Sequence, residues 1–383
     1  MIVVETICWV CGWIVFYTCI FYPILLVIGN NLIRKTRQVG PVQATVSIIV
    51  PVHNEEANLA RRLDELTRLL QSAGIVGEII VVSDGSTDRS VEIARGYADR
   101  GVRVIELPER LGKAAALNSG VAEARCELLV FADARQRWAD DALARLIENF
   151  ADPGVGAVSG DLVLEESDGV LAGVGLYWQF EKWLRMQESQ LGSQVGVTGA
   201  ICAVRRALFT PIPSGTLLDD VFWPMHVVLQ GYRVVHDERA QAFDRLPEDP
   251  SDEFRRKVRT LAGNFQLLTL LPVSALFPWG NGVWWQWVSH KLMRLAVPWA
   301  LIGMLVSSAI IGEIAYQIFF VLQMLGYGLA ALGLIPAVAN VVKPLGTASS
   351  FLVLNAAAWL AFWVWITGQA GQSWQKAQYQ AND

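Results

Sequence analysis

The chain begins with an apolar stretch that is long enough to cross a bilayer. Residues 2–29 read IVVETICWVCGWIVFYTCIFYPILLVIG, with Glu5 as their one charged residue. A membrane-spanning helix needs roughly 20 consecutive, mainly apolar residues. Because the stretch has no basic start and no small-residue cleavage site, it predicts a retained transmembrane helix over residues 1–32 rather than a signal peptide.

The rest of the chain divides by charge. With 53% hydrophobic and 17% charged side chains, the protein is too apolar to be soluble throughout. Most of the charge falls in the middle, whereas apolar residues gather at both ends. The division predicts a cytosolic domain over 44–252, amphipathic interface helices over 253–287, three transmembrane helices over 288–370 and a tail over 371–383.

Basic residues next to the apolar stretches predict the orientation. Arg34, Lys35 and Arg37 follow the first stretch, and Lys291 and Arg294 precede the second. By the positive-inside rule, the charged domain faces the cytoplasm, which makes the protein a multi-pass protein of the cytoplasmic (inner) membrane. A net charge of −5 without a basic stripe argues against a nucleic-acid partner.

The charged middle alternates apolar runs with helical patterns. Near-continuous apolar strands of this kind predict an α/β fold with a mostly parallel sheet covered by helices on both faces. The runs are TVSIIVPV, EIIVV, VRVIEL, ELLVFA and VGAVSG, and helical patterns such as ANLARRLDELTRLLQSAG and RSVEIARGYADR separate them.

Polar residues follow these strands where ligands bind in such sheets. His53 and Glu55 follow the first strand, Asp84 the second, and Asp133 and Arg135 the fourth. The dinucleotide fingerprint is absent because PVHNEE contains no glycine. The phosphate-loop motif is absent as well. Gly112 and Lys113 match its end, but Leu107 occupies the position of its first glycine.

The ordered motifs resemble those of the family 2 glycosyltransferases. The membrane-embedded branch is most similar, which includes cellulose, chitin and hyaluronan synthases and the nodulation N-acetylglucosaminyltransferases. The resemblance covers about residues 45–375 and rests on PVHNEE, VVSDGSTD, LGKAAALNSG, FADA, VTGAICAVRR, LLDDVFWPMHVVLQGYRV and RRKVRT.

This resemblance implies a Rossmann-like GT-A fold inserted between transmembrane helices, and inverting transfer from a nucleotide-diphosphate sugar, usually a UDP-sugar. It implies that Asp84, with His53 and Glu55, holds the uracil and ribose, and that Lys113 reaches the diphosphate or ribose. A turn-forming aspartate in SDGS is the alternative for Asp84.

The resemblance also implies Mg²⁺ or Mn²⁺ as cofactor, with Asp133 as the metal ligand. The usual motif is Asp-x-Asp, and Arg135 stands here in place of the second acid. One carboxylate with substrate phosphates can suffice for such a metal. Arg135 is then expected to assist at the diphosphate, and a structural ion pair at the domain surface is the alternative.

Asp219 and Asp220 precede a helical pattern and are expected at a helix amino terminus, where acids also suit the helix dipole. The resemblance assigns Asp220 as the catalytic base and Asp219 to the acceptor side. It places Gly199 and Ala200 under the acceptor. Glu181 and Arg185, four residues apart, would pair in any helix and carry no function by spacing alone.

Polymerising relatives carry Gln-x-x-Arg-Trp where this chain has Arg256, Arg259 and Thr260. The resemblance implies that Arg259 and Arg256 meet the donor diphosphate, while the missing tryptophan argues against long processive synthesis. A second interpretation is an amphipathic helix whose arginines face anionic lipid.

The combined prediction is a membrane glycosyltransferase for polysaccharide biosynthesis, such as an exopolysaccharide synthase. It would transfer a sugar to a growing polysaccharide or lipid-linked glycan, alone or with oligomer or export partners in the bilayer. Two alternatives remain: a polyprenyl-phosphate sugar synthase, and a non-catalytic scaffold of an export complex.

Overall fold

A computed structural model describes residues 1–165, 172–245, 250–335, 338 and 342–368. Its centre is an eight-stranded sheet of order β3-β2-β1-β4-β7-β6-β8-β5. The strands are β1 (Val46–Val52), β2 (Gly77–Asp84), β3 (Val102–Leu107), β4 (Leu128–Ala132), β5 (Arg137–Trp138), β6 (Val155–Glu165), β7 (Ile201–Arg205) and β8 (Arg233–Arg245).

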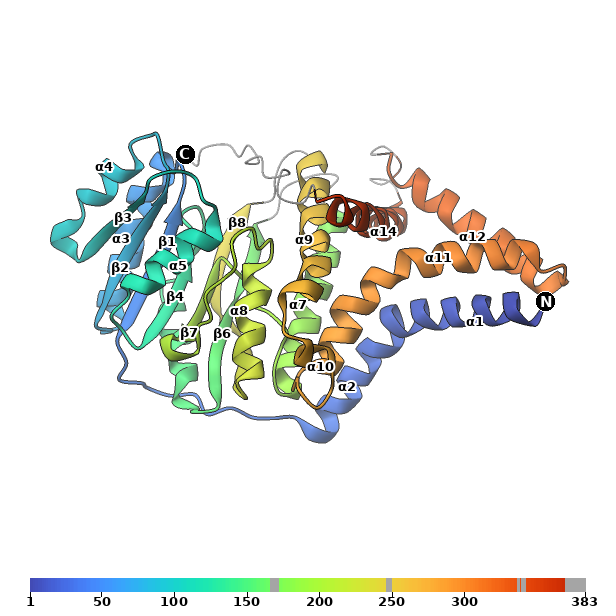
Figure 1. Cartoon of the computed structure of the whole chain (residues 1–383), viewed down its shortest axis with the longest axis horizontal. Helices are drawn as coiled ribbons and strands as arrows, with labels where there is room; N and C mark the ends of the chain where they lie inside the picture. The colour runs from blue at the N-terminus through green and yellow to red at the C-terminus, as the bar shows by residue number, and fades with distance from the viewer. Residues whose placement is uncertain (166–171, 246–249, 336–337, 339–341, 369–383) are drawn as a thin grey trace.

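Helices surround the sheet and continue away from it (Figure 1). The longer helices are α1 (Ile2–Phe16), α2 (Tyr22–Ile33), α3 (Glu56–Ser72), α4 (Ser90–Arg95), α5 (Lys113–Glu123), α6 (Ala142–Ile147), α7 (Ala172–Leu191), α8 (Asp219–Leu229), α9 (Pro250–Leu270), α11 (Met293–Ile310), α12 (Ile314–Leu332) and α14 (Lys343–Ile366). The short ones are η1 (Tyr17–Phe21), η2 (Ala98–Arg100), η3 (Glu148–Ala151), η4 (Arg206–Leu208), η5 (Val273–Leu276), α10 (Trp284–Gln286) and η6 (Trp287–Leu292).

The first half of the sheet is parallel, which confirms the mostly parallel α/β fold. β1 alternates Ile48 and Val50 toward one buried core with Ile49 toward the other. Leucines of α3 fill the first core together with α4 and α6, whereas α5 and α8 fill the second. β2 and β3 lie on one side of β1, and β4 lies on the other. The order in which the chain adds strands therefore reverses between β1 and β4, although these two strands are parallel. Ligands bind at such switch points.

The other half of the sheet is antiparallel where it meets β4. β7 runs against β4, with Ala132 opposite Ile201. The residues before β7, Gly199 and Ala200, therefore lie beside the residue after β4, Asp133. Strand β5 is also antiparallel to its partner, β8. The sequence pattern did not predict these pairings.

Four helices are long and apolar enough to cross a membrane: Ile2–Ile33, Trp284–Ile310, Ile314–Leu332 and Leu345–Ile366. α1 runs beside α11 on the side away from β1–β4 (Figure 1). The apolar face of α9, expected at the headgroups, packs on α14, where Phe265 stacks on Trp365 at 5.5 Å. The expected tail, 371–383, lies outside the described residues.

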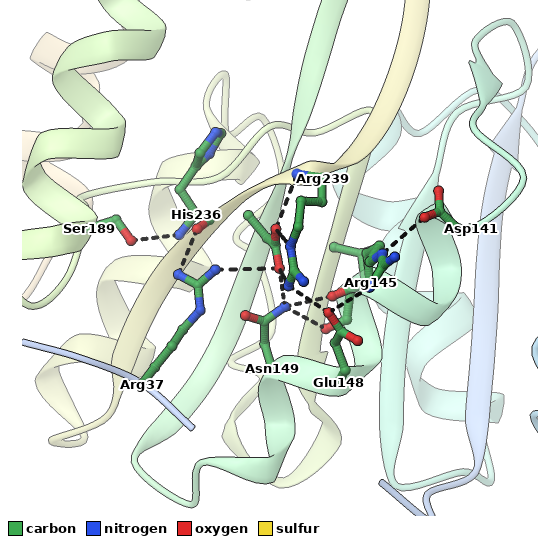
Figure 2. Close-up of polar contacts among 10 residues, drawn as sticks. Arg37, Asp141, Arg145, Glu148, Asn149, Ser189, His236 and Arg239 are labelled. Atoms are coloured by element: carbon green, nitrogen blue, oxygen red, sulfur yellow. Dashed lines mark hydrogen bonds and ion pairs between the residues drawn. The ribbon is translucent and has the colours of Figure 1, made fainter. Parts of the chain in front are cut away.

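The segment after α2 is attached to the sheet by Arg37, which the sequence suggested only as a topology signal. Its guanidinium donates to the carbonyl of His236 at 2.8 Å and pairs with the buried carboxylate of Asp237 at 3.4 Å. Figure 2 shows Asn149 and Arg239 converging on the same place, and both bond to Asp237. This polar cluster couples the amino-terminal helix to the sheet.

Candidate active site

A cavity of about 1630 Å³ opens at the carboxyl ends of β1 and β4. We call it the sheet-edge cavity. Nearly all of the residues singled out in the sequence line it, and they come from elements far apart in the chain. These residues are His53, Glu55, Asp84, Lys113, Asp133, Arg135, Gly199, Ala200, Asp220, Arg256 and Arg259. Asp219 borders a small adjoining pocket with Lys113 and Asp220.

Asp84 is buried at the end of β2 and holds the next loop in place. Its carboxylate accepts hydrogen bonds from the backbone N–H groups of Leu111 at 2.7 Å and Gly112 at 2.9 Å. Gly112 has a φ of +93°, a conformation that favours glycine. The ring of His53 bonds to the Asp84 carbonyl at 2.7 Å. Asp84 thus fixes the loop that leads into Lys113.

We expect Asp84→Ala to lower the free energy of unfolding by about 1–3 kcal/mol, because two backbone donors lose their charged acceptor. The same change should raise the donor KM, since the loop before Lys113 loosens. Asp84→Asn keeps one acceptor oxygen and should show a smaller effect on both. Thermal unfolding and donor kinetics measure the two effects. Equal stability of all three proteins would contradict this account.

Lys113 occupies the middle of the acidic side of the cavity. Its Nζ donates to Asp133 Oδ1 at 2.8 Å. Burial disfavours its charge, yet the carboxylates of Asp133, Asp219 and Asp220 raise its pKa above the usual value. Lys113 therefore remains a cation beside the residues that follow β4 and begin α8.

Asp220 lies in the first turn of α8, as the sequence predicted for a helix amino terminus. Burial and the neighbouring Asp219 raise its pKa to about 6. A carboxylate with this pKa is ionised at pH 7 and still basic enough to accept a proton. Arg259 lines the same cavity from α9, and burial lowers its pKa.

Arg135 is engaged in an ion pair. Its guanidinium donates to Asp244 of β8 at 2.6 Å, and Gln136 donates to the same oxygen at 2.9 Å. The pairing of β5 with β8 brings these residues together. Arg135 also lines the cavity, so its position is compatible with both interpretations of the sequence. Arg256 similarly pairs with Glu253 at 2.8 Å on α9.

Among the described residues, no three His, Cys, Asp or Glu side chains are arranged to hold a metal ion. Asp133 is one-third exposed and lines the cavity. A single carboxylate of this kind fits Mg²⁺ or Mn²⁺ when substrate phosphates complete the coordination. His236 is not placed to join a metal in this cavity. Its ring nitrogen is buried 3.7 Å from the carboxylate of Asp161, and His236 does not line the cavity.

Two glycines border Asp220 in different ways. A Cβ on Gly199 would lie 3.6 Å from Lys113 Nζ and 3.7 Å from Asp220 Cβ, at ordinary contact distances. A Cβ on Gly196 would lie 2.9 Å from the backbone oxygen of Asp220, which is too close. Gly199 thus leaves open space beside the Asp220 side chain, and Gly196 lets the chain pack against α8.

We expect Gly196→Ala to cost about 1–3 kcal/mol of stability through overpacking. Gly199→Ala should leave stability within about 0.5 kcal/mol and reduce acceptor use, because its methyl group fills space next to Asp220. Chemical unfolding and acceptor kinetics separate these two effects. A stable Gly196→Ala protein would show that the α8 contact can relax.

A cationic cluster in the same cavity was not predicted from the sequence. Three cations surround the carboxylate of Glu181. Arg294 donates to it at 2.7 Å, Lys291 lies 3.4 Å from it and Arg185 lies 3.9 Å from it. Burial opposes ionisation of Glu181, but Arg294, His290 and Lys291 lower its pKa well below the usual range. The sequence held one signal for this cluster: the basic residues of SHKLMR could have been expected to pair with Glu181 and Glu188 of α7.

The fold is of the GT-A type. The structure resembles that of a mannosyltransferase from Pyrobaculum calidifontis in complex with GDP-Man and Mn²⁺, with a TM-score of 0.73 and 24% identity, covering 96% of this chain and 99% of that one. Residues 47–211 match the family described as Glycosyl transferase family 2, as the motifs predicted.

Two curated relatives each match part of the chain. The poly-beta-1,6-N-acetyl-D-glucosamine synthase of Staphylococcus aureus is 24% identical over 232 residues, which is 58% of this chain and 55% of that protein. The dolichyl-phosphate beta-glucosyltransferase of Drosophila melanogaster is 46% identical over 98 residues, which is 23% of this chain and 30% of that protein. This chain spans about half the length of the first relative and less of the second.

Proposed function

We propose that the protein transfers a sugar, with inversion, from a nucleotide-diphosphate sugar to a growing polysaccharide or lipid-linked glycan at the cytoplasmic face of the membrane. A UDP-sugar is the first donor to test. One observation supports this proposal above the others: Asp84, Asp133 and Asp220, from three separate elements, line one cavity at the switch point of the sheet.

The donor would occupy the side of the cavity beneath β1, β2 and β4. His53, Glu55 and the Asp84 loop provide polar groups for the base and ribose. Lys113 and Arg259 are the cations available to the diphosphate, with Arg256 nearby on α9. Asp133 would hold Mg²⁺ or Mn²⁺, which when bound neutralises charge on the leaving diphosphate.

Asp220 would act as the base on the other side of the anomeric carbon. It takes the proton of the acceptor hydroxyl as that oxygen bonds to the anomeric carbon, and the nucleoside diphosphate leaves with the electron pair of the broken bond. Attack opposite the leaving group inverts the configuration. Asp219 borders the same region, and Gly199 and Ala200 leave space for the acceptor sugar.

The four candidate membrane helices support placement at a bilayer. Three of them contribute directly to the cavity, since Cys19 of the first span, Val297 of α11 and Leu354 of α14 line it. Acceptor and catalytic domain would then meet at the membrane surface.

Purified full-length protein should release nucleoside diphosphate from at least one donor in a panel of UDP- and GDP-sugars, and supplying membrane lipids should increase the release. Asp140→Asn, a change at an exposed carboxylate, is the matched control. If no donor is consumed under any condition, the scaffold alternative replaces this proposal.

A further inference from the structure

The sheet-edge cavity is larger than one donor requires. Ligand sites commonly measure about 300–1,000 Å³, whereas this cavity measures about 1630 Å³. Its far wall comes from the candidate membrane helices, with Cys19 of η1, Val297 of α11 and Phe351 of α14. A second substrate can therefore occupy the cavity and reach an apolar environment.

A group of cations lines the same cavity. Arg185, Lys291 and Arg294 line the cavity and share the carboxylate of Glu181. Their side chains are 22%, 13% and 26% exposed. Three cations therefore gather around one carboxylate on this part of the described cavity wall, where they are available to an anionic ligand.

A hydrogen-bonded relay fixes the cluster. His290 bonds to Glu181 at 2.8 Å through one ring nitrogen and to Glu188 at 2.7 Å through the other. Tyr22 of α2 donates to the same Glu188 oxygen at 2.6 Å. The relay joins α2, α7 and η6, so the cations project from a preorganised support.

The cluster acts electrostatically on the reaction centre. Arg185 and Lys291 both oppose the rise in the pKa of Asp220 that burial and Asp219 produce. Their charges therefore lie within effective range of the base. Lys113, which is bonded to Asp133, acts on the pKa of Asp220 in the same direction.

We infer that the acceptor is a phosphate-linked lipid saccharide whose phosphate binds Arg185, Lys291 and Arg294 while a hydroxyl of its sugar faces Asp220. This inference rests on the proposed function and specifies its acceptor. Guanidinium groups pair with phosphate through two hydrogen bonds. The phosphate takes no part in bond exchange; it anchors the sugar, and the lipid chain extends along the apolar wall.

A paired acceptor panel tests this inference. Full-length protein in nanodiscs is given undecaprenyl diphosphate-linked glucose, galactose and N-acetylglucosamine, and the neutral decyl glycosides of the same sugars. We expect kcat/KM for a phosphate-linked acceptor to exceed that of its neutral counterpart at least about tenfold. Arg185→Gln and Lys291→Gln should each remove most of this preference by raising the acceptor KM, with the donor KM unchanged.

Arg95→Gln, which removes a cation from an exposed ion pair, is the matched charge control and should behave as wild type. Equal use of neutral glycosides, or a rise in donor KM in the two variants, overturns the inference. Transfer of the sugar directly to undecaprenyl phosphate, if it persists in the Asp220→Asn protein, also overturns the inference. Donor consumption without extension of any phosphate-linked acceptor refutes this inference alone, whereas absence of donor consumption refutes the proposed function as well.

Discussion

Asp220→Asn should reduce sugar transfer by about 10²–10⁴-fold, the usual contribution of a positioned base. The amide has nearly the same shape as the carboxylate and cannot accept the hydroxyl proton. Donor binding should persist, because Lys113 and the Asp84 loop remain in place. Initial rates with a saturating donor, together with calorimetric donor titration, measure the two properties separately.

Stability distinguishes this loss from misfolding. Burial and Asp219 disfavour the ionised form of Asp220, so an uncharged side chain removes an unfavourable charge from the folded state. The thermal midpoint of Asp220→Asn at pH 8 should therefore be at least as high as that of the wild type. A turnover close to wild type would assign the base elsewhere.

The pH profile of the wild type should report the same group. Because the pKa of Asp220 is about 6, its basic form is lost as the pH falls through 6. We expect kcat/KM, which reports the groups of the free protein, to be constant above about pH 7 and to fall about tenfold per unit well below pH 6. A profile that stays flat to pH 5 would contradict the assignment.

Removal of divalent metal should produce the second large effect. We expect excess chelator to lower turnover by about a hundredfold or more, since several kcal/mol of charge stabilisation at the diphosphate are lost. Added Mn²⁺ or Mg²⁺ should restore it. Full turnover in excess chelator would remove the metal from this account.

The presence of Asp133 as a single candidate ligand leads to a further prediction about metal affinity. Because Asp133 is bonded to Lys113 and no second acid follows it at position 135, the free protein should bind Mn²⁺ weakly. Nucleoside diphosphate should strengthen that binding, and Asp133→Asn should abolish the increase. Paramagnetic resonance of Mn²⁺ with and without UDP or GDP measures this without turnover. Tight binding to the free protein would indicate ligands other than Asp133.

Local sequence patterns were sufficient for the parallel half of the fold. The apolar runs that predicted strands became β1, β2, β3 and β4 of the parallel half and β6 of the other half, because burial on both faces selects continuous apolar residues. The helix expected over 89–100 instead ends at Arg95, before Gly96, a weak helix former, and resumes as a short 3-10 turn.

The apolar helices, the parallel strands and the polar residues that follow them could thus be predicted from the sequence, since each depends on neighbours a few positions away. The pairing of distant side chains depends instead on how the elements pack. Arg135 meets Asp244 across 109 residues, and Glu181 meets Arg294 across 113. Such contacts depend on how β8 and α11 pack, and no local periodicity records that packing. The cation cluster beside Asp220 exists for this reason, although its residues first suggested only membrane topology or a helical ion pair.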